Sequence, residues 1–236
     1  MTQLDINAGR LVANASESER AGFIRRTYFH LGGAILAFAG LETALVQSGV
    51  AESFLHLLKG GQWMWLIVMG LFMGVSSIAN NWAHSAMSKE MQYAGLGLFV
   101  VAEAIVFMPL IYIAQRYAPD ILSHAALVTL MLVGGITFTA FTTRKNFSFL
   151  GPVLSIVSWI ALGVIVTSII FGFTLGAVFS GIMILFAAGA VLYSTSNIIH
   201  EYHTEQHVAA SLSLFSSVGL LFWYILQFMM SIGNND

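Results

Sequence analysis

Residues 150–172 read LGPVLSIVSWIALGVIVTSIIFG, a run of 23 residues without a single Asp, Glu, Lys, Arg or His. About 20 predominantly apolar residues in a helix are enough to cross the hydrocarbon core of a bilayer. Six other stretches of the chain have the same character. The sequence therefore predicts an all-α membrane protein with seven transmembrane helices, at residues 22–48, 63–83, 91–114, 121–142, 150–172, 174–197 and 206–233.

The composition of the whole chain supports this fold class. Of the 236 residues, 58% are hydrophobic and 8% are charged, whereas an ordinary soluble domain is about 25% charged. So few charges cannot cover the surface of a soluble enzyme. The chain has no cysteine, which excludes disulfides and thiolate metal sites. A net charge of −2 gives no basic surface for nucleic acid.

Three regions follow from these spans. Residues 1–21 are polar and charged and are expected to form a cytoplasmic N-terminal segment, residues 22–233 a single transmembrane domain, and residues 234–236 an external tail. Basic residues accumulate on the cytoplasmic side of membrane proteins. An N-in, C-out orientation leaves only Lys59 and Arg116 outside and puts seven basic residues inside: Arg10, Arg20, Arg25, Arg26, Lys89, Arg144 and Lys145.

Two acidic residues lie within predicted spans. Glu103 is near the middle of the third span and Glu42 is in the outer half of the first. An ionisable side chain at membrane depth is costly unless it is paired, neutral or in contact with water, so each is a functional candidate. One interpretation is a cation or proton pathway that both acids line in a common cavity. The other is a neutral, hydrogen-bonded carboxyl group that locks the bundle.

Three histidines surround the connection between the last two spans. In a helix, His200, His203 and His207 would lie on one face at positions i, i+3 and i+7. Imidazoles in that arrangement can bind zinc, copper or nickel. The alternative is a solvated cytoplasmic loop.

Small residues are spaced four apart at Gly70 and Gly74, and again at Gly172 and Gly176. Such spacing lets helices approach closely in lipid and is expected to serve packing within the bundle. The spans contain no pair of acids and no nucleophile with a base beside it. The sequence therefore predicts that the chain is not an enzyme and that it holds no cofactor.

Five stretches of the chain carry a resemblance to the transmembrane Bax inhibitor motif family. The junction FTTRKNFSFLG at 141–151 is similar to the family's Thr-basic-basic-Asp-Phe-Ser-Phe-Leu-Gly stretch, and LYSTSNIIH at 192–200 to its Leu-Tyr-Asp-Thr-Gln followed by Ile-Ile-His. Residues 210–227 resemble its last span, and residues 93–97 and 102–104 its third. Together these matches cover residues 20–230.

The resemblance implies a compact bundle of seven helices in which the other six wrap the last one. Members act as pH-sensitive Ca²⁺ leak pathways or as cytoprotective stress proteins, and some bacterial members associate with a membrane-bound AAA protease. In the leak mechanism, two aspartates on the sixth and seventh spans control the pore through their protonation. Here those positions align with Ser194 and Ser217, and the aspartate of the basic junction aligns with Asn146.

Serine hydroxyls do not titrate near neutral pH, so the paired-aspartate switch cannot operate in this chain, although a hydrogen bond between the two serines can still join the helices. The first functional hypothesis is an inner-membrane protein, of bacterial type, that conducts Ca²⁺ past Glu103 and Glu42 with altered or absent pH gating. The second is a non-conducting regulator of a membrane AAA protease or stress complex, which would bind its partner through residues 1–21. Transition-metal handling by the three histidines is a third.

Overall fold

The computed structural model describes residues 10–85 and 88–233. Within these ranges the chain forms a short 3-10 helix, η1 (Val12–Asn14), and eight α-helices. Their bounds are α1 (Glu17–Gln47), α2 (Val50–Leu58), α3 (Gln62–Ala83), α4 (Lys89–Tyr117), α5 (Pro119–Thr143), α6 (Leu150–Phe171), α7 (Gly176–His200) and α8 (His207–Gly233). Seven of these helices in the described part are long and apolar enough to cross a membrane. The predicted fold class and number of spans are confirmed.

Local capping residues fix where the helices begin and end. The Ser16 side chain accepts a hydrogen bond from the Glu19 backbone and Glu19 bonds back to Ser16, so α1 begins at Glu17, five residues before the predicted start of the span. The Ser88 hydroxyl likewise accepts from the Met91 N–H at the start of α4. Gly172 ends α6 in the left-handed conformation, with φ 73°.

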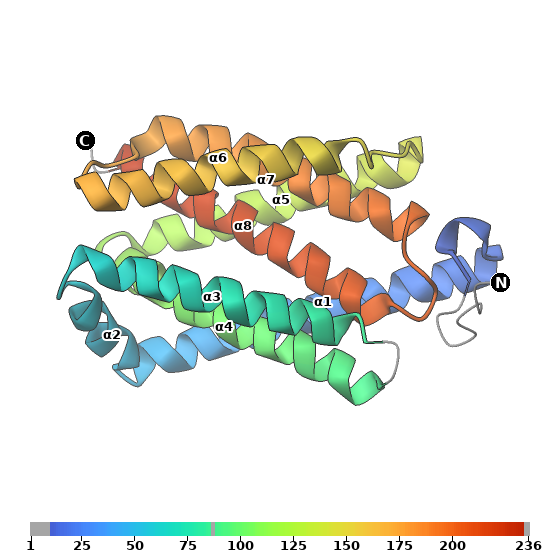
Figure 1. The fold of residues 1–236 in the computed structure, drawn as a ribbon, viewed down its shortest axis with the longest axis horizontal. Coiled ribbons are helices and arrows are strands. Elements are labelled where there is room, and N and C mark those ends of the chain that lie inside the picture. Colours follow the sequence, from blue (N-terminus) through green and yellow to red (C-terminus); the bar gives the residue numbers. More distant parts are fainter. Residues whose placement is uncertain (1–9, 86–87, 234–236) are drawn as a thin grey trace.

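Helix α8 lies between the other helices (Figure 1) and contacts α1, α3, α4, α5 and α7. Of its most apolar stretch, 67% is buried, against 56% for α4 and 22% or less for the other five spans. The outer helices instead present large apolar side chains outward, including Phe29, Val178 and Leu185, which are 75–79% exposed. Apolar surface of this kind on all sides fits a bundle surrounded by lipid tails.

The connection between the first two spans contains a helix that the sequence analysis did not predict. Gly49, with φ 78°, ends α1, and the chain then forms the nine-residue helix α2 at the end of the bundle opposite the N-terminus (Figure 1). Ala51 and Leu58 are buried on its inner face, while Leu57 is 54% exposed. An amphipathic helix at this level fits the interface between lipid tails and headgroups.

Residues 10–16 are part of the folded bundle and not a separate polar segment. Val12 is fully buried beside Phe23, Ile198 and Val208. Its backbone N–H donates to the Tyr202 carbonyl at 2.9 Å, and the Thr204 N–H donates to the Arg10 carbonyl at 2.9 Å. This segment therefore lies across the loop between α7 and α8. Residues 1–9 and the predicted external tail at 234–236 lie outside the described residues.

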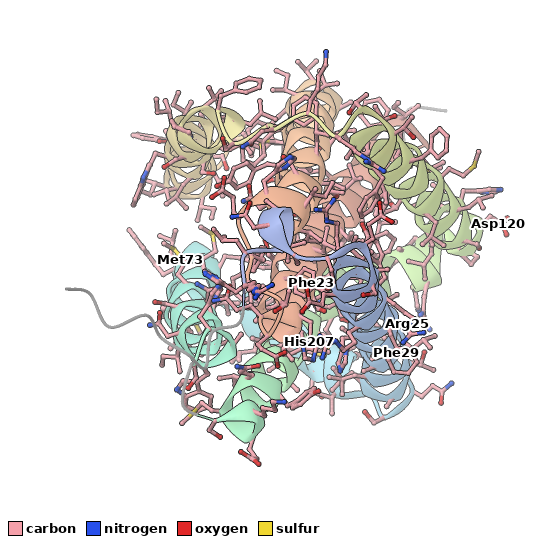
Figure 2. The ribbon with its side chains drawn as sticks, turned by 90° about the vertical axis from the view of Figure 1, so that its right-hand side faces the viewer. Phe23, Arg25, Phe29, Met73, Asp120 and His207 are labelled. Carbon is pink, nitrogen blue, oxygen red and sulfur yellow. The ribbon has the colours of Figure 1, made fainter. Side chains whose placement is uncertain are left out.

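Figure 2 looks along the bundle from the N-terminal end. Phe23 lies toward the centre, below the N-terminal segment, whereas Arg25 and Phe29 lie on the outward face of α1. The view shows that α1 turns one face to the core and the opposite face to the surroundings. That division holds for the outer helices of a membrane bundle.

Candidate functional site

The centre of the candidate site is Glu103, on α4, whose side chain is only 4% exposed. Its carboxyl group lies directly against Gly219 of the central helix α8. A Cβ atom at position 219 would collide with Glu103 Oε1 and would lie 2.9 Å from Cδ. Its other oxygen, Oε2, is buried without a hydrogen-bond partner. The carboxyl group fits into the bundle only because residue 219 has no side chain.

Glu103 borders a cavity of about 550 Å³ between α3, α4, α6, α7 and α8. Among the described residues of its wall, Glu103 is the only Asp, Glu, Lys, Arg or His. Most of the wall is aromatic or aliphatic, and its other polar members are Ser158, Ser216, Tyr224 and Gln227. Met73 of α3 also lines the cavity, is 49% exposed, and lies on the side of α3 toward α6 (Figure 2).

A second cavity, of about 540 Å³, adjoins the first at the end of the bundle opposite the N-terminus. Leu175 and Gln227 belong to the walls of both. The remainder of the second wall is more polar: it consists of Ser168, Thr174, Gly176, Ala177 and Ser231. The two cavities thus share part of their walls, and the second lies between the first and that end of the bundle.

Glu42 is placed differently from Glu103. It is 3% exposed on α1, and both of its carboxyl oxygens are buried without a hydrogen-bond partner. It is not in the wall of the Glu103 cavity. On α1, Phe38 lies one turn before Glu42 and packs edge-on against Phe107 of α4, with ring centroids 5.2 Å apart. The cavity that Glu103 borders is therefore not shared with Glu42.

Ser194 on α7 and Ser217 on α8 meet in the core. Their hydroxyl oxygens are 2.8 Å apart, and both side chains are buried. Ser213 donates to Ser194 Oγ at 3.2 Å, and Ser217 donates to the Ser213 carbonyl at 3.0 Å. Ser194 must then donate to Ser217, because each hydroxyl carries one proton. The serine–serine hydrogen bond expected from the sequence is present, within a closed ring of three serines.

Comparison with known sequences shows which protein family this chain belongs to. The sequence family described as inhibitor of apoptosis-promoting Bax1 matches residues 20–235. The chain belongs to the Bax inhibitor family. Bax inhibitor 1 of Schizosaccharomyces pombe is 27% identical over 230 residues, which cover 95% of this chain and 82% of that protein. An uncharacterised protein of Pseudomonas aeruginosa is 26% identical over 225 residues, covering 95% of this chain and 96% of the relative.

A plant relative, Protein LIFEGUARD 4 of Arabidopsis thaliana, is 26% identical over 218 residues, covering 88% of this chain and 83% of that protein. No solved structure matches the sequence. The alignment with all three relatives extends over nearly the whole chain. The Bax inhibitor family thus accounts for the entire seven-helix bundle and not for one part of it.

The histidines of this Bax inhibitor family member do not form the predicted metal site. Helix α7 ends at His200 and α8 begins at His207, so residues 201–206 are a non-helical loop and the three imidazoles do not share a helix face. His200 Nδ1 lies 3.0 Å from the Ser196 carbonyl, and the ring of His207 packs 5.0 Å from that of His30. Within residues 10–85 and 88–233, no three His, Cys, Asp or Glu side chains are grouped to hold a metal. The prediction failed because it required an uninterrupted helix.

The basic junction between α5 and α6 retains its local fold with an amide in place of a carboxylate. Asn146 Oδ1 accepts a hydrogen bond from the Ser148 N–H at 2.8 Å, and the Phe147 N–H donates to the buried Ser196 hydroxyl at 2.9 Å. An Asn or Asp side chain can form this turn equally well, because both offer an acceptor oxygen. The Asn146 departure from the family pattern therefore keeps an acceptor oxygen for this turn.

The hydrogen bond between the two serines should be measurable as a coupling energy. Ser194→Ala and Ser217→Ala are each expected to lower the free energy of unfolding by about 1 kcal/mol, with a coupling of about 0.6 kcal/mol between them, as is usual inside membranes. A double-mutant cycle in detergent micelles checks this value. Ser155→Ala, on the exposed surface of α6, is the control. Strictly additive losses would show that the two hydroxyls do not interact.

Sequence reasoning missed two residues: Gly219, which lies against Glu103, and Ser213, which completes the ring of serines. Both lie in the stretch 210–227 that resembles the family's last span, but the resemblance assigns neither a role, because each matters only through the helix packed against it. The spacing of Ser213 and Ser217 by four residues was a usable signal, since it places both hydroxyls on one face of α8. Gly219 gave no comparable signal.

Proposed function

We propose that this chain is a cation leak pathway, with Ca²⁺ as the transported ion, rather than an enzyme. The observation that supports the proposal best is Glu103, a buried carboxyl group with an unpartnered oxygen in the wall of a cavity inside a seven-helix bundle. An acid retained at membrane depth without a cationic partner is characteristic of ion and proton pathways. Glu42 shares its burial but not the cavity, so Glu103 alone carries the assignment.

The adjoining polar cavity supports a direction for the pathway. It opens at the end of the bundle where α6 ends and α7 begins, away from the N-terminal segment. With the N-terminus in the cytoplasm, as the distribution of basic residues favours, this opening faces outward. The proposed location is a bacterial inner membrane, and a relative in Pseudomonas aeruginosa of nearly equal length supports it.

The proposed pathway lacks the family's pH switch. Two nearby carboxyl groups share protons and titrate as a coupled pair, but Ser194 and Ser217 hold each other through a hydrogen bond with no titrating group. Conduction in this chain would therefore not pass through protonation of that pair.

Uptake of Ca²⁺ into liposomes tests the proposal. Liposomes that carry the purified protein and a trapped Ca²⁺ indicator are expected to take up Ca²⁺ faster than protein-free liposomes at every pH from 6 to 8, without the step that a titrating aspartate pair would produce. Uptake equal to that of protein-free liposomes at every pH would contradict conduction.

The second candidate function is a non-conducting regulator of a membrane AAA protease or stress complex. The first two turns of α8 support it, because a tightly packed core there leaves no room for an ion. The residues buried in this part of the helix are Val208, Ala209, Ala210, Leu212 and Leu214. Its test is co-purification of a large partner with the full chain and with a chain lacking residues 2–9. The deletion stops at residue 9 because Val12 belongs to the core. Loss of the partner on deletion would support the regulator.

A further inference from the structure

The Glu103 cavity has the size and composition of a binding site for an organic molecule. Its volume of about 550 Å³ lies within the roughly 300–1,000 Å³ typical of small-molecule sites, which are mostly apolar with a few polar groups that orient the ligand. Trp65 and Phe72 of α3, Phe179 of α7 and Trp223 of α8 contribute aromatic surface. The ligand must therefore have a substantial apolar body.

The charge of the ligand follows from the wall of the cavity. Glu103 has one buried oxygen without a partner, and the wall contains no Lys, Arg or His. A carboxylate in such surroundings is costly unless a cation accompanies it. Because the described residues of the wall supply no cation, a ligand that brings a positive charge would let the Glu103 carboxyl group ionise there.

Helix periodicity places two aromatic rings beside this carboxyl group. Phe107 follows Glu103 by one turn on α4, and Trp223 follows Gly219 by one turn on α8. Their rings pack edge to face with centroids 4.9 Å apart, and both line the cavity. An ammonium group at Glu103 would thus have an aromatic wall, and the faces of such rings attract cations.

The set of ligating atoms favours an organic ammonium over a resident metal ion. Bound Ca²⁺ takes six to eight oxygen ligands, but Glu103 supplies the only carboxylate, and the other oxygens of the wall are those of Ser158, Ser216, Tyr224 and Gln227, together with backbone atoms of the helices. An ammonium group is satisfied by one carboxylate and one or two further acceptors. Ca²⁺ that passes through this cavity would have to keep part of its water shell.

From these observations we propose that the Glu103 cavity is a binding site for a lipophilic amine. The ammonium group pairs with the Glu103 carboxylate beside Gly219, and the alkyl or aryl body fills the apolar space between α3, α6 and α7. The adjoining polar cavity, through Leu175 and Gln227, provides a route to it. The proposal rests on the cavity and its carboxyl group and does not require that the chain conduct ions.

Photolabelling with two matched probes tests this binding site. An eight-carbon alkylamine and the corresponding alkanol, each with a diazirine in the chain, are added to the purified protein in liposomes and the labelled residues are mapped by mass spectrometry. The amine is expected to label the cavity walls on α3, α6 and α7 about tenfold more than the alcohol, which corresponds to ~1.4 kcal/mol of binding free energy. Excess unlabelled octylamine should abolish that labelling, and octanol should not.

Variants then locate the charge partner. Glu103→Gln is expected to reduce amine labelling to the level of the alcohol, whereas Glu42→Gln, which changes the other buried acid outside the cavity, should leave it unchanged. Equal labelling by both probes would identify a pocket for lipid acyl chains and overturn the proposal, as would labelling that avoids the cavity or survives Glu103→Gln. If Glu103→Gln does not fold, the comparison of amine with alcohol on the unmodified protein decides. A protein that binds the amine but passes no Ca²⁺ would refute only the leak.

Discussion

Replacement of Gly219 with alanine is expected to lower the free energy of unfolding by about 2–3 kcal/mol, because the added methyl group overpacks the contact between α8 and Glu103. A Cβ there would overlap the Glu103 carboxyl group, which is itself buried, with its Oε2 enclosed by protein. In a Glu103→Ala background the same replacement should cost less than about 1 kcal/mol, since the two sites are in direct contact and their effects are not additive. Thermal and SDS denaturation in micelles measure both values.

The control for this prediction is Gly97→Ala, also within a membrane-spanning helix. A Cβ at position 97 would have nothing within 4 Å outside its own helix, so this change reports helix propensity alone, which favours alanine by about 1 kcal/mol. Gly219→Ala should therefore lower the free energy of unfolding, whereas Gly97→Ala should raise it. A Gly219→Ala protein as stable as the parent would show that Glu103 does not lie against α8.

Filling the Glu103 cavity should reduce Ca²⁺ uptake about tenfold, which corresponds to ~1.4 kcal/mol of added barrier. Ala161 of α6 is 7% exposed and lines the cavity beside Met183 and Tyr224. A phenylalanine at position 161 would put its ring into the space next to Glu103, while the charge of the carboxyl group stays in place. Uptake into liposomes, normalised to folded protein, gives the effect.

The matched control is Ile160→Phe, one residue earlier on the same helix. Ile160 is 60% exposed and is not part of the cavity wall, so a larger apolar side chain there faces outward. Its Ca²⁺ uptake should equal that of the parent. Undiminished uptake by Ala161→Phe, together with normal folded yield, would exclude this cavity as the route.

The seven spans could be predicted because lipid imposes a long uninterrupted apolar run on each of them. The α2 helix escaped prediction because Glu52, His56 and Lys59 make residues 49–62 look like a loop. The acid at position 103 was recognisable from its cost in a membrane. That it borders a cavity, and that Glu42 does not, depends on how α4, α6 and α8 are rotated against each other, which no single segment specifies.

The glycines also show that helix contacts depend on tertiary packing and cannot be predicted from spacing in the sequence. Gly70 and Gly74 have the spacing of a packing motif, yet a Cβ at either would have nothing within 4 Å outside its own helix. Gly95, which is in no such pair, lies directly against the backbone of α3: a Cβ there would lie 2.6 Å from the Ala83 nitrogen. Spacing alone shows which glycines share a helix face, but the neighbouring helix decides which of them are in contact.

The measurement that tests the central claim most directly is Ca²⁺ uptake by liposomes carrying Glu103→Gln beside liposomes carrying Glu42→Gln. Both changes remove the charge from a buried acid in a transmembrane helix with almost no change in shape. If the cavity at Glu103 carries the ion, Glu103→Gln should reduce uptake about tenfold, or ~1.4 kcal/mol, while Glu42→Gln conducts like the parent. Equal uptake by the two variants and the parent, at equal folded yield, would contradict a pathway through Glu103.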